Sequence, residues 1–445
     1  MSSLIFSSKK GDNGSQADGL QQAELPGSME TGAGQNNKTW DGGNSQLGRG
    51  NINMSDLTRP FLVLYVIWHP LNTTGASLAE ALRDHFRRKL FANVAGGTGV
   101  SVIFRSSGGS EGRPPSAIDL EEAETTAAIV LAEQQLVKDV GWCAYIHELT
   151  ERTEAAGFRA RVFPVSLDED ALKLGVSEQA LRWDQWPDNE VPRLRRLIVE
   201  LTYELCRMLR YHLEHLKHPQ EEEDALERFL QKVQIFISHS KHDEDGERIA
   251  HAIRDNLQRG HGLASFFDVY DIPAGIRFQQ VLLAQLKRSA IVAVHTDSYS
   301  SRDWCQLEII MAKHGNRPLL IANCLRDFDE RGFPYMGNVP IVRMDPQQLN
   351  RIDIVIGRLL DEVLKDFLWR CRVELARALA GPEVVFLPRQ PELISLTSCL
   401  PVAADAPDPM IVYPDPPLSQ GELQLFARLA PRVRLRSMNA WLAAP

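Results

Sequence analysis

The chain has 445 residues, of which 44% are hydrophobic and 24% are charged, a composition typical of globular proteins. Its formal net charge of −9 disfavours non-specific binding to nucleic acid over the whole chain. No stretch approaches the roughly 20 apolar residues of a membrane span, and the beginning of the chain lacks the apolar run of a secretory signal. We therefore expect a cytoplasmic protein with on the order of two or three domains.

The cysteines are scattered and include no close pair with the spacing of metal ligands. We interpret them as free thiols and expect no metal site. They stand at Cys143, Cys206, Cys305, Cys324, Cys371 and Cys399.

Residues 1–56 are rich in Gly, Ser, Asn and Gln, which predicts a disordered leader. A first ordered unit is expected over 57–216, where apolar runs predict strands and helical periodicity predicts helices. The strands are expected at 60–68, 100–104, 127–133 and 159–167, and the helices at 75–91, 142–157 and 194–213.

A charged stretch at 217–227 precedes a second unit at 230–380, in which the same kinds of element recur. The expected strands are 233–240, 263–268, 290–296 and 317–325, and the expected helices are 245–258, 278–289, the segment from Trp304, and 351–379. Each unit has a Trp-Cys pair opening a helix, at Trp142 and Trp304, which suggests an internal duplication.

Strands that alternate with helices predict parallel sheets covered on both faces, so the fold class is α/β. Ligands bind such sheets beyond the carboxyl ends of the strands. Residues 381–445 are expected to form a small α/β extension, with strands at 383–388, 410–414 and 433–437 and a helix at 419–429 capped by Ser419 and Glu422. This extension is either a sensor module or an addition to the second sheet.

Residues 233–345 resemble a Toll/interleukin-1-receptor-like (TIR) domain of bacterial type. The matching stretches are IFISHSKHDED, FFDVYDIPAG, IVAVHTDSYSSRDWCQLEI and LLIANC, which together cover about a quarter of the chain. The resemblance implies a flavodoxin-like parallel sheet, and with the duplication it implies two such units in tandem. Some members of the family cleave NAD⁺ at the nicotinamide–ribose bond, and others are adaptors that assemble with further TIR domains.

The resemblance places the family's catalytic carboxylate at Glu308. Loss of nicotinamide leaves an oxocarbenium-like ribosyl cation, which a fixed carboxylate stabilises. Trp304 lies four residues earlier on the same helical face and is expected to wall the pocket. The simpler alternatives are a solvated charge for Glu308 and a core residue for Trp304.

Further NAD⁺ contacts are expected from Ser240, Lys241, Phe267 and Asp268. Ser240 and Lys241 precede a helix, whose free N–H groups attract phosphate, although Ser240 and Asp243 also have capping-box spacing. The loop 271–278 gates the pocket and packs between neighbouring domains in the family; otherwise it is a plain surface turn. Cys305 is expected in the core.

The first unit departs from the pattern, because Glu148 lies six residues after Trp142 and so does not share its face. We interpret 57–216 as a degenerate TIR-like unit without activity.

The resemblance implies an NAD⁺-cleaving enzyme of a defence or signalling response that self-associates and responds to an unidentified activator. NAD⁺ is its substrate, and no cofactor is expected. The alternatives are a non-enzymatic adaptor and an enzyme that makes a cyclic ADP-ribose-type signal.

Overall fold

The computed structural model describes residues 59–89, 100–107, 113–187, 189–218, 230–259, 266–267, 286, 289–329, 332–400 and 408–443. The leader predicted at 1–56 and the loop 271–278 lie outside these ranges, as does nearly all of the helix predicted at 278–289. No helix in the described part of the chain is both long and apolar enough to cross a membrane.

The first unit is built on a parallel sheet with strand order β2-β1-β3-β4. The strands are β1 (Leu62–Trp68), β2 (Ser101–Arg105), β3 (Thr125–Ala132) and β4 (Ala160–Ser166). Every residue of β1 and β3 is buried, as expected for central strands covered on both faces. The four predicted strands of this unit are confirmed.

Helices cover this first sheet and lead out of it. They are α2 (Thr73–Arg83), α3 (Gln134–Lys138), α4 (Val140–Ala155) and α5 (Glu190–Lys217). The helix predicted at 75–91 begins earlier, where the side chain of Asn72 caps it by accepting from Gly75 N at 2.7 Å. It does not continue as one α-helix, because the chain winds into a π-helix at Asp84–Lys89.

The second unit is built on a parallel sheet with strand order β6-β5-β7-β8-β9. The strands are β5 (Ile235–His239), β6 (Phe266–Phe267), β7 (Ala290–His295), β8 (Leu319–Asn323) and β9 (Ile341–Arg343). The strand β9 was not predicted from the sequence, because three residues are too few to show a strand pattern. Only Val342, the middle residue, is buried. The helices are α7 (Glu244–Arg259), α9 (Asp303–His314) and α10 (Ile352–Ala376).

The first four strands of the second sheet in chain order repeat the order of the first sheet, and β9 extends it by one strand. In each unit the central strand after the switch, β3 or β7, leads to the helix that carries the Trp-Cys pair. This agreement in topology supports the proposal of a duplication, which the sequence pattern raised.

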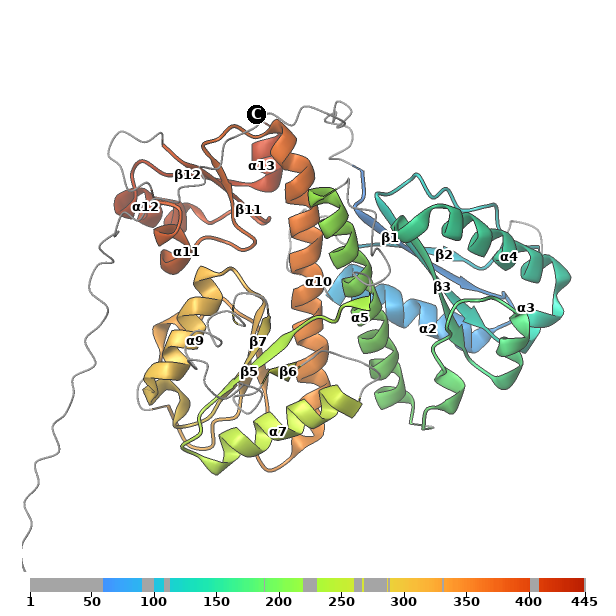
Figure 1. The fold of residues 1–445 in the computed structure, drawn as a ribbon, viewed down its shortest axis with the longest axis horizontal. Coiled ribbons are helices and arrows are strands. Elements are labelled where there is room, and N and C mark those ends of the chain that lie inside the picture. Colours follow the sequence, from blue (N-terminus) through green and yellow to red (C-terminus); the bar gives the residue numbers. More distant parts are fainter. Residues whose placement is uncertain are drawn as a thin grey trace, which may run out of the picture. The chain divides into compact units, whose positions relative to one another are not determined.

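The closing helices α5 and α10 pack side by side, and the two sheets share one hydrophobic core around them (Figure 1). Cys206 of α5 points its Sγ at the Leu360 carbonyl at 3.7 Å, and Cys371 of α10 does the same toward Leu209. Gly357 lies where a Cβ would come within 3.3 Å of Val199. The small residues therefore allow the two helices to approach closely.

Residues after α10 form a separate three-stranded parallel sheet rather than an extension of the second sheet. Its strands are β10 (Val384–Phe386), β11 (Met410–Tyr413) and β12 (Arg434–Ser437), with helices α11 (Leu393–Thr397), α12 (Gln420–Leu429) and α13 (Met438–Leu442). The capping box of Ser419 and Glu422 is confirmed. Trp369 and Val373 of α10 join the core of this small sheet.

Candidate functional site

Strands β5 and β7 are neighbours, but the chain leaves β5 toward β6 on one side and β7 toward β8 on the other. Loops that depart in opposite directions leave a crevice at the carboxyl ends of the strands, which is the usual ligand site in this architecture. Ser238 and His239 end β5, and His295 ends β7. The N-terminal end of α9 lies beside them, because Cys305 Sγ is 3.7 Å from the His239 carbonyl oxygen.

Glu308 turns its carboxylate from α9 to the end of β5. Ser238 Oγ donates a hydrogen bond to Glu308 Oε2, and Ser238 Oγ lies 2.5 Å from the hydroxyl of Tyr299. A serine hydroxyl has one hydrogen, so Tyr299 donates to Ser238 while Ser238 donates to Glu308. Ser238 and Tyr299 are fully buried, and this chain of hydroxyls fixes the carboxylate in one position.

Burial raises the pKa of Glu308 to about 7, while the hydrogen bond from Ser238 and the positive charge of Lys241 act in the opposite direction. The same surroundings raise the pKa of Tyr299, mainly through burial and then through Cys305 and Glu308. A carboxyl group whose pKa is raised toward neutrality at the strand ends makes Glu308 a candidate functional residue. Its half-buried position and its hydrogen bond from Ser238 do not fit a fully solvated helix-face charge, which was the simpler interpretation.

Ser240 and Asp243 lie at the same edge in a second hydrogen-bond network. The Asp243 carboxylate accepts from Thr296 Oγ1 at 2.7 Å, from Ser298 Oγ, and from Gly246 N at 2.5 Å. Ser240 is buried, and its Oγ lies 2.7 Å from Ser298 Oγ. These contacts join the loop after β5 to the loop after β7.

The helix cap in this loop differs from the capping box that the spacing of Ser240 and Asp243 suggested. Asp243 caps α7 through Gly246 N, whereas Ser240 Oγ accepts from His242 N at 3.3 Å and lies outside the helix. A Cβ at Gly246 would lie 2.6 Å from the Ser240 carbonyl oxygen, so only glycine fits this close turn. Lys241 is exposed at the tip of the loop.

Trp304 and Cys305 open α9 with opposite exposures. Trp304 has 46% of its surface exposed, so it is not a core residue. Cys305 is buried in the core beneath α9, as expected. Burial, followed by the charge of Glu308, raises the pKa of the Cys305 thiol to about 12, which keeps it protonated and unsuited to act as a nucleophile.

A third group at this edge is formed by His295, Ser300 and Asp329, of which the sequence placed the first two at the strand ends but did not reveal Asp329. His295 Nε2 lies 2.9 Å from Asp329 Oδ2 and 3.2 Å from Ser300 Oγ, and Ser300 donates to Asp329 at 2.7 Å. The His295 ring also contacts Tyr299 edge to face. His295, the polar residue that ends the apolar run of β7, was the signal in the sequence that could have indicated this group. Its partner Asp329 lies 34 residues later, so the pairing could not be predicted.

Two of the predicted contact residues are only partly placed. Phe267 ends the short strand β6, and its backbone pairs with Phe236, the second residue of β5, so it lies several residues below the carboxyl edge where Ser238 and His239 stand. Asp268 lies outside the described residues, as does the loop 271–278. Within the described residues, no group of three His, Cys, Asp or Glu side chains is placed to hold a metal ion.

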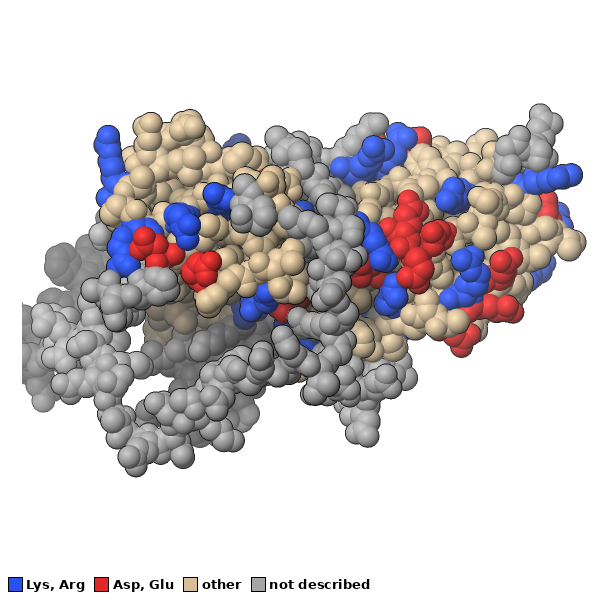
Figure 2. Space-filling model, turned by 90° about the horizontal axis from the view of Figure 1, so that it is seen from above, with Lys and Arg blue, Asp and Glu red and all other residues tan. Residues whose placement is uncertain are grey.

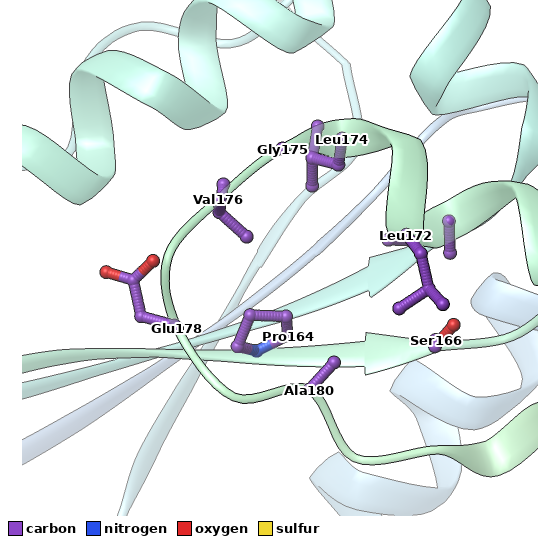
Figure 3. Close-up of a pocket in the computed structure, with 10 residues that line it drawn as sticks. Pro164, Ser166, Leu172, Leu174, Gly175, Val176, Glu178 and Ala180 are labelled. Carbon is purple, nitrogen blue, oxygen red and sulfur yellow. The ribbon is translucent and has the colours of Figure 1, made fainter.

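The corresponding place in the first unit has a different character. Trp142 is fully buried in the core, where His69 packs edge to face against it, and Glu148 is exposed. Figure 3 shows a cavity at the end of β4 whose lining includes Pro164 and Leu174. Its volume is about 40 Å³, well below the roughly 300–1,000 Å³ of small-molecule sites, and it lies at the ends of β3 and β4 rather than of β1 and β3.

Comparison with known families agrees with the geometry of the second unit. Residues 235–362 match the family model described as TIR domain. The chain contains a TIR domain. This match covers β5 to the first half of α10 and includes Ser240, Lys241, Trp304 and Glu308. A search of curated proteins gave no match to the chain.

Proposed function

We propose that the TIR domain cleaves NAD⁺ at the bond between nicotinamide and ribose, with Glu308 as the catalytic carboxylate. The observation that carries this proposal is the position of Glu308, which is held by Ser238 at the carboxyl ends of β5 and β7 with a pKa of about 7. TIR domains include both NAD⁺-cleaving enzymes and adaptors, and an adaptor has no need of a carboxylate held near neutrality.

The chemistry requires a negative charge beside the ribose. The bond from the anomeric carbon to the pyridinium nitrogen breaks, and its electron pair neutralises the nicotinamide, so no acid is needed for the leaving group. The ribosyl cation that remains is stabilised by the Glu308 carboxylate. Water then adds to that carbon and loses a proton, which gives ADP-ribose, or the adenine attacks instead and gives a cyclic product.

The remaining contacts are proposed from their place around Glu308. Lys241 lies near enough to affect the Glu308 carboxylate electrostatically and is assigned to the diphosphate. Ser240 holds the loop that carries Lys241. Trp304 is assigned to the nicotinamide side, and contact of Phe267 and Asp268 with NAD⁺ is proposed from the sequence alone.

A second candidate function, a scaffold that assembles through TIR domains, is supported by the apolar surface of the domain. Phe328 is 63% exposed and Ile341 is 58% exposed, both on loops or edges of the TIR sheet. Exposed large apolar residues favour protein contacts. Self-association and catalysis are compatible, and we propose that assembly, promoted by an unidentified activator in the cytoplasm, raises the activity in a defence response of bacterial type.

The test is an assay of NAD⁺ loss by the purified full-length protein, with the products separated by chromatography. The proposal predicts nicotinamide in equal amount to ADP-ribose or its cyclic form. If NAD⁺ is untouched at high protein concentration and with a crowding agent, while light scattering shows large assemblies, the scaffold function replaces the enzyme.

A further inference from the structure

A large cavity lies at the edge of the TIR sheet opposite Glu308. It has a volume of about 630 Å³ and is bounded by the C-terminal part of α5, the middle of α10 and the amino ends of β5, β7 and β8. Figure 1 shows α5 and α10 running along each other beside these strands. Small-molecule sites in proteins occupy roughly 300–1,000 Å³, so the cavity has the size of a ligand site.

The cavity is positively charged although the chain as a whole is acidic. Among the described residues that line it, five are Lys or Arg and two are Asp or Glu, an excess of three positive charges. The chain carries a formal charge of −9. On the face shown in Figure 2, by contrast, basic and acidic side chains are interspersed.

The two lining carboxylates are already used by two of the cations. Asp366 pairs with Arg370 at 2.6 Å, and Glu214 pairs with Lys217 at 3.2 Å. Arg210 donates to the side chain of Gln231 at 3.0 Å. The cations of the lining that stand outside these two ion pairs are Arg210, Lys232 and Arg317.

The side chain of Arg317 is half-buried, with a hydrogen-bond donor left unsatisfied by the described part of the chain. Its Nε atom is buried and has no hydrogen-bond partner among the described residues. Burial lowers the pKa of Arg317, and the neighbouring charge of Arg370 lowers it further, while Asp366 acts in the opposite direction. Burying a polar group without a partner costs free energy, so an anion bound beside Arg317 would be stabilising.

The wall also offers neutral polar and aromatic groups. Ser289 Oγ and Gln234 Oε1 are buried and lack hydrogen-bond partners among the described residues. Two aromatic residues, Tyr211 and Phe367, are among the residues that line the same cavity. The combination of cations, unsatisfied polar atoms and aromatic rings fits a ligand with phosphates and a flat heterocycle.

We propose that this cavity binds a phosphate-bearing nucleotide, with Arg210, Arg317 and Lys232 holding its phosphates. Free inorganic phosphate shares part of this chemistry, but it would fill little of the volume and would leave Ser289 and Gln234 unsatisfied. The site is remote from Glu308 and independent of the proposed cleavage of NAD⁺. Because its walls come from both α5 and α10, an occupant would hold the two closing helices together.

The experiment measures thermal midpoint and calorimetric binding for the full-length Glu308→Gln protein with ATP, GTP, CTP, UTP, adenosine and inorganic phosphate. We expect at least one nucleoside triphosphate to raise the midpoint and to bind more weakly as salt rises, because exposed charge interactions are screened. Adenosine, which lacks phosphate, and inorganic phosphate should have much smaller effects. Using this variant separates the cavity from turnover at the TIR site.

The variants identify the cavity. Arg317→Ala should weaken triphosphate binding by about 10-fold to 100-fold, which is the range for losing a hydrogen bond to a charged group. Lys232→Ala, at an exposed position on the rim, should weaken it by a smaller factor and tests the site if Arg317→Ala does not fold. Arg428→Ala on the surface of α12 is the matched control and should bind as the parent does. Absence of binding by all four triphosphates, equal protection by phosphate or adenosine, or unchanged binding in both cavity variants would overturn the proposal.

Discussion

Ser238 donates a hydrogen bond to the carboxylate of Glu308 across a separation of 70 residues in the chain. Ser238 lies two residues after Phe236 on β5 and so shares its side of the sheet, which packs beneath α9. The strand therefore presents a hydroxyl to α9 where its alternating pattern would otherwise place an apolar side chain. This single contact fixes the carboxylate on which the proposed chemistry depends.

Replacing Glu308 by Gln should make the protein more stable at alkaline pH. The pKa of Glu308 is about 7 in the folded protein and 4.5 in the unfolded chain, so the folded state holds the proton more tightly. Its stabilising contribution is complete below pH 4.5 and is lost as the pH rises to about 7. Glu308→Gln removes that loss, worth up to about 3 kcal/mol. Denaturant unfolding of both proteins at pH 5 and pH 8 measures this difference in unfolding free energy. A difference of equal size at the two pH values would contradict a raised pKa for Glu308.

Ser238→Ala should move the pH dependence of NAD⁺ cleavage toward alkaline pH. The hydrogen bond from Ser238 lowers the pKa of Glu308, so its removal raises that pKa above about 7. Because the carboxylate form is the active one, the rate should rise with pH, and the rising limb should lie at higher pH in the variant. Ser301→Ala, at an exposed position in the segment between β7 and α9, is the control. The same dependence of rate on pH in the parent and in Ser238→Ala would show that Ser238 does not set the pKa of Glu308.

Cys305→Ala should retain most of the activity. The thiol is buried and its pKa is raised to about 12, so it is protonated at neutral pH and does not react. Alkylation of the native protein followed by mass spectrometry should leave Cys305 unmodified. Loss of activity on the scale of Glu308→Gln, with the fold intact, would indicate a covalent mechanism instead.

Lys313→Ala should destabilise the junction between the TIR domain and the C-terminal sheet. Lys313 is buried, and its ammonium group contacts the Gly337 carbonyl at 2.7 Å and Glu392 at 2.8 Å. Its removal leaves Glu392 without this partner and should cost about 1–3 kcal/mol. The exposed Lys173→Ala, which also removes one partner of an ion pair, should leave the unfolding free energy little changed. Equal unfolding free energies for the two variants would show that the contacts of Lys313 with Gly337 and Glu392 do not stabilise the protein.

All strands of the two large sheets except β9 could be predicted, because their residues form short apolar runs. Glu308 could be identified through resemblance to the TIR family, but its partner Ser238 could not, since the contact depends on how α9 lies over the sheet. The same is true of His295 and Asp329, which tertiary structure brings together. The burial of Lys313 could not be predicted from the sequence either, because a lysine on a helix is normally exposed.

The most direct test of the account compares nicotinamide release by the parent, Glu308→Gln and Glu148→Gln across a series of protein concentrations. Glu148 is the exposed carboxylate on the corresponding helix of the first unit and provides the matched control. The account predicts that the parent and Glu148→Gln release nicotinamide at equal rates, with specific activity rising as the protein assembles. Glu308→Gln should lose at least about 100-fold, since the carboxylate stabilises charge only in the transition state. Release by Glu308→Gln at the parental rate would contradict the central claim.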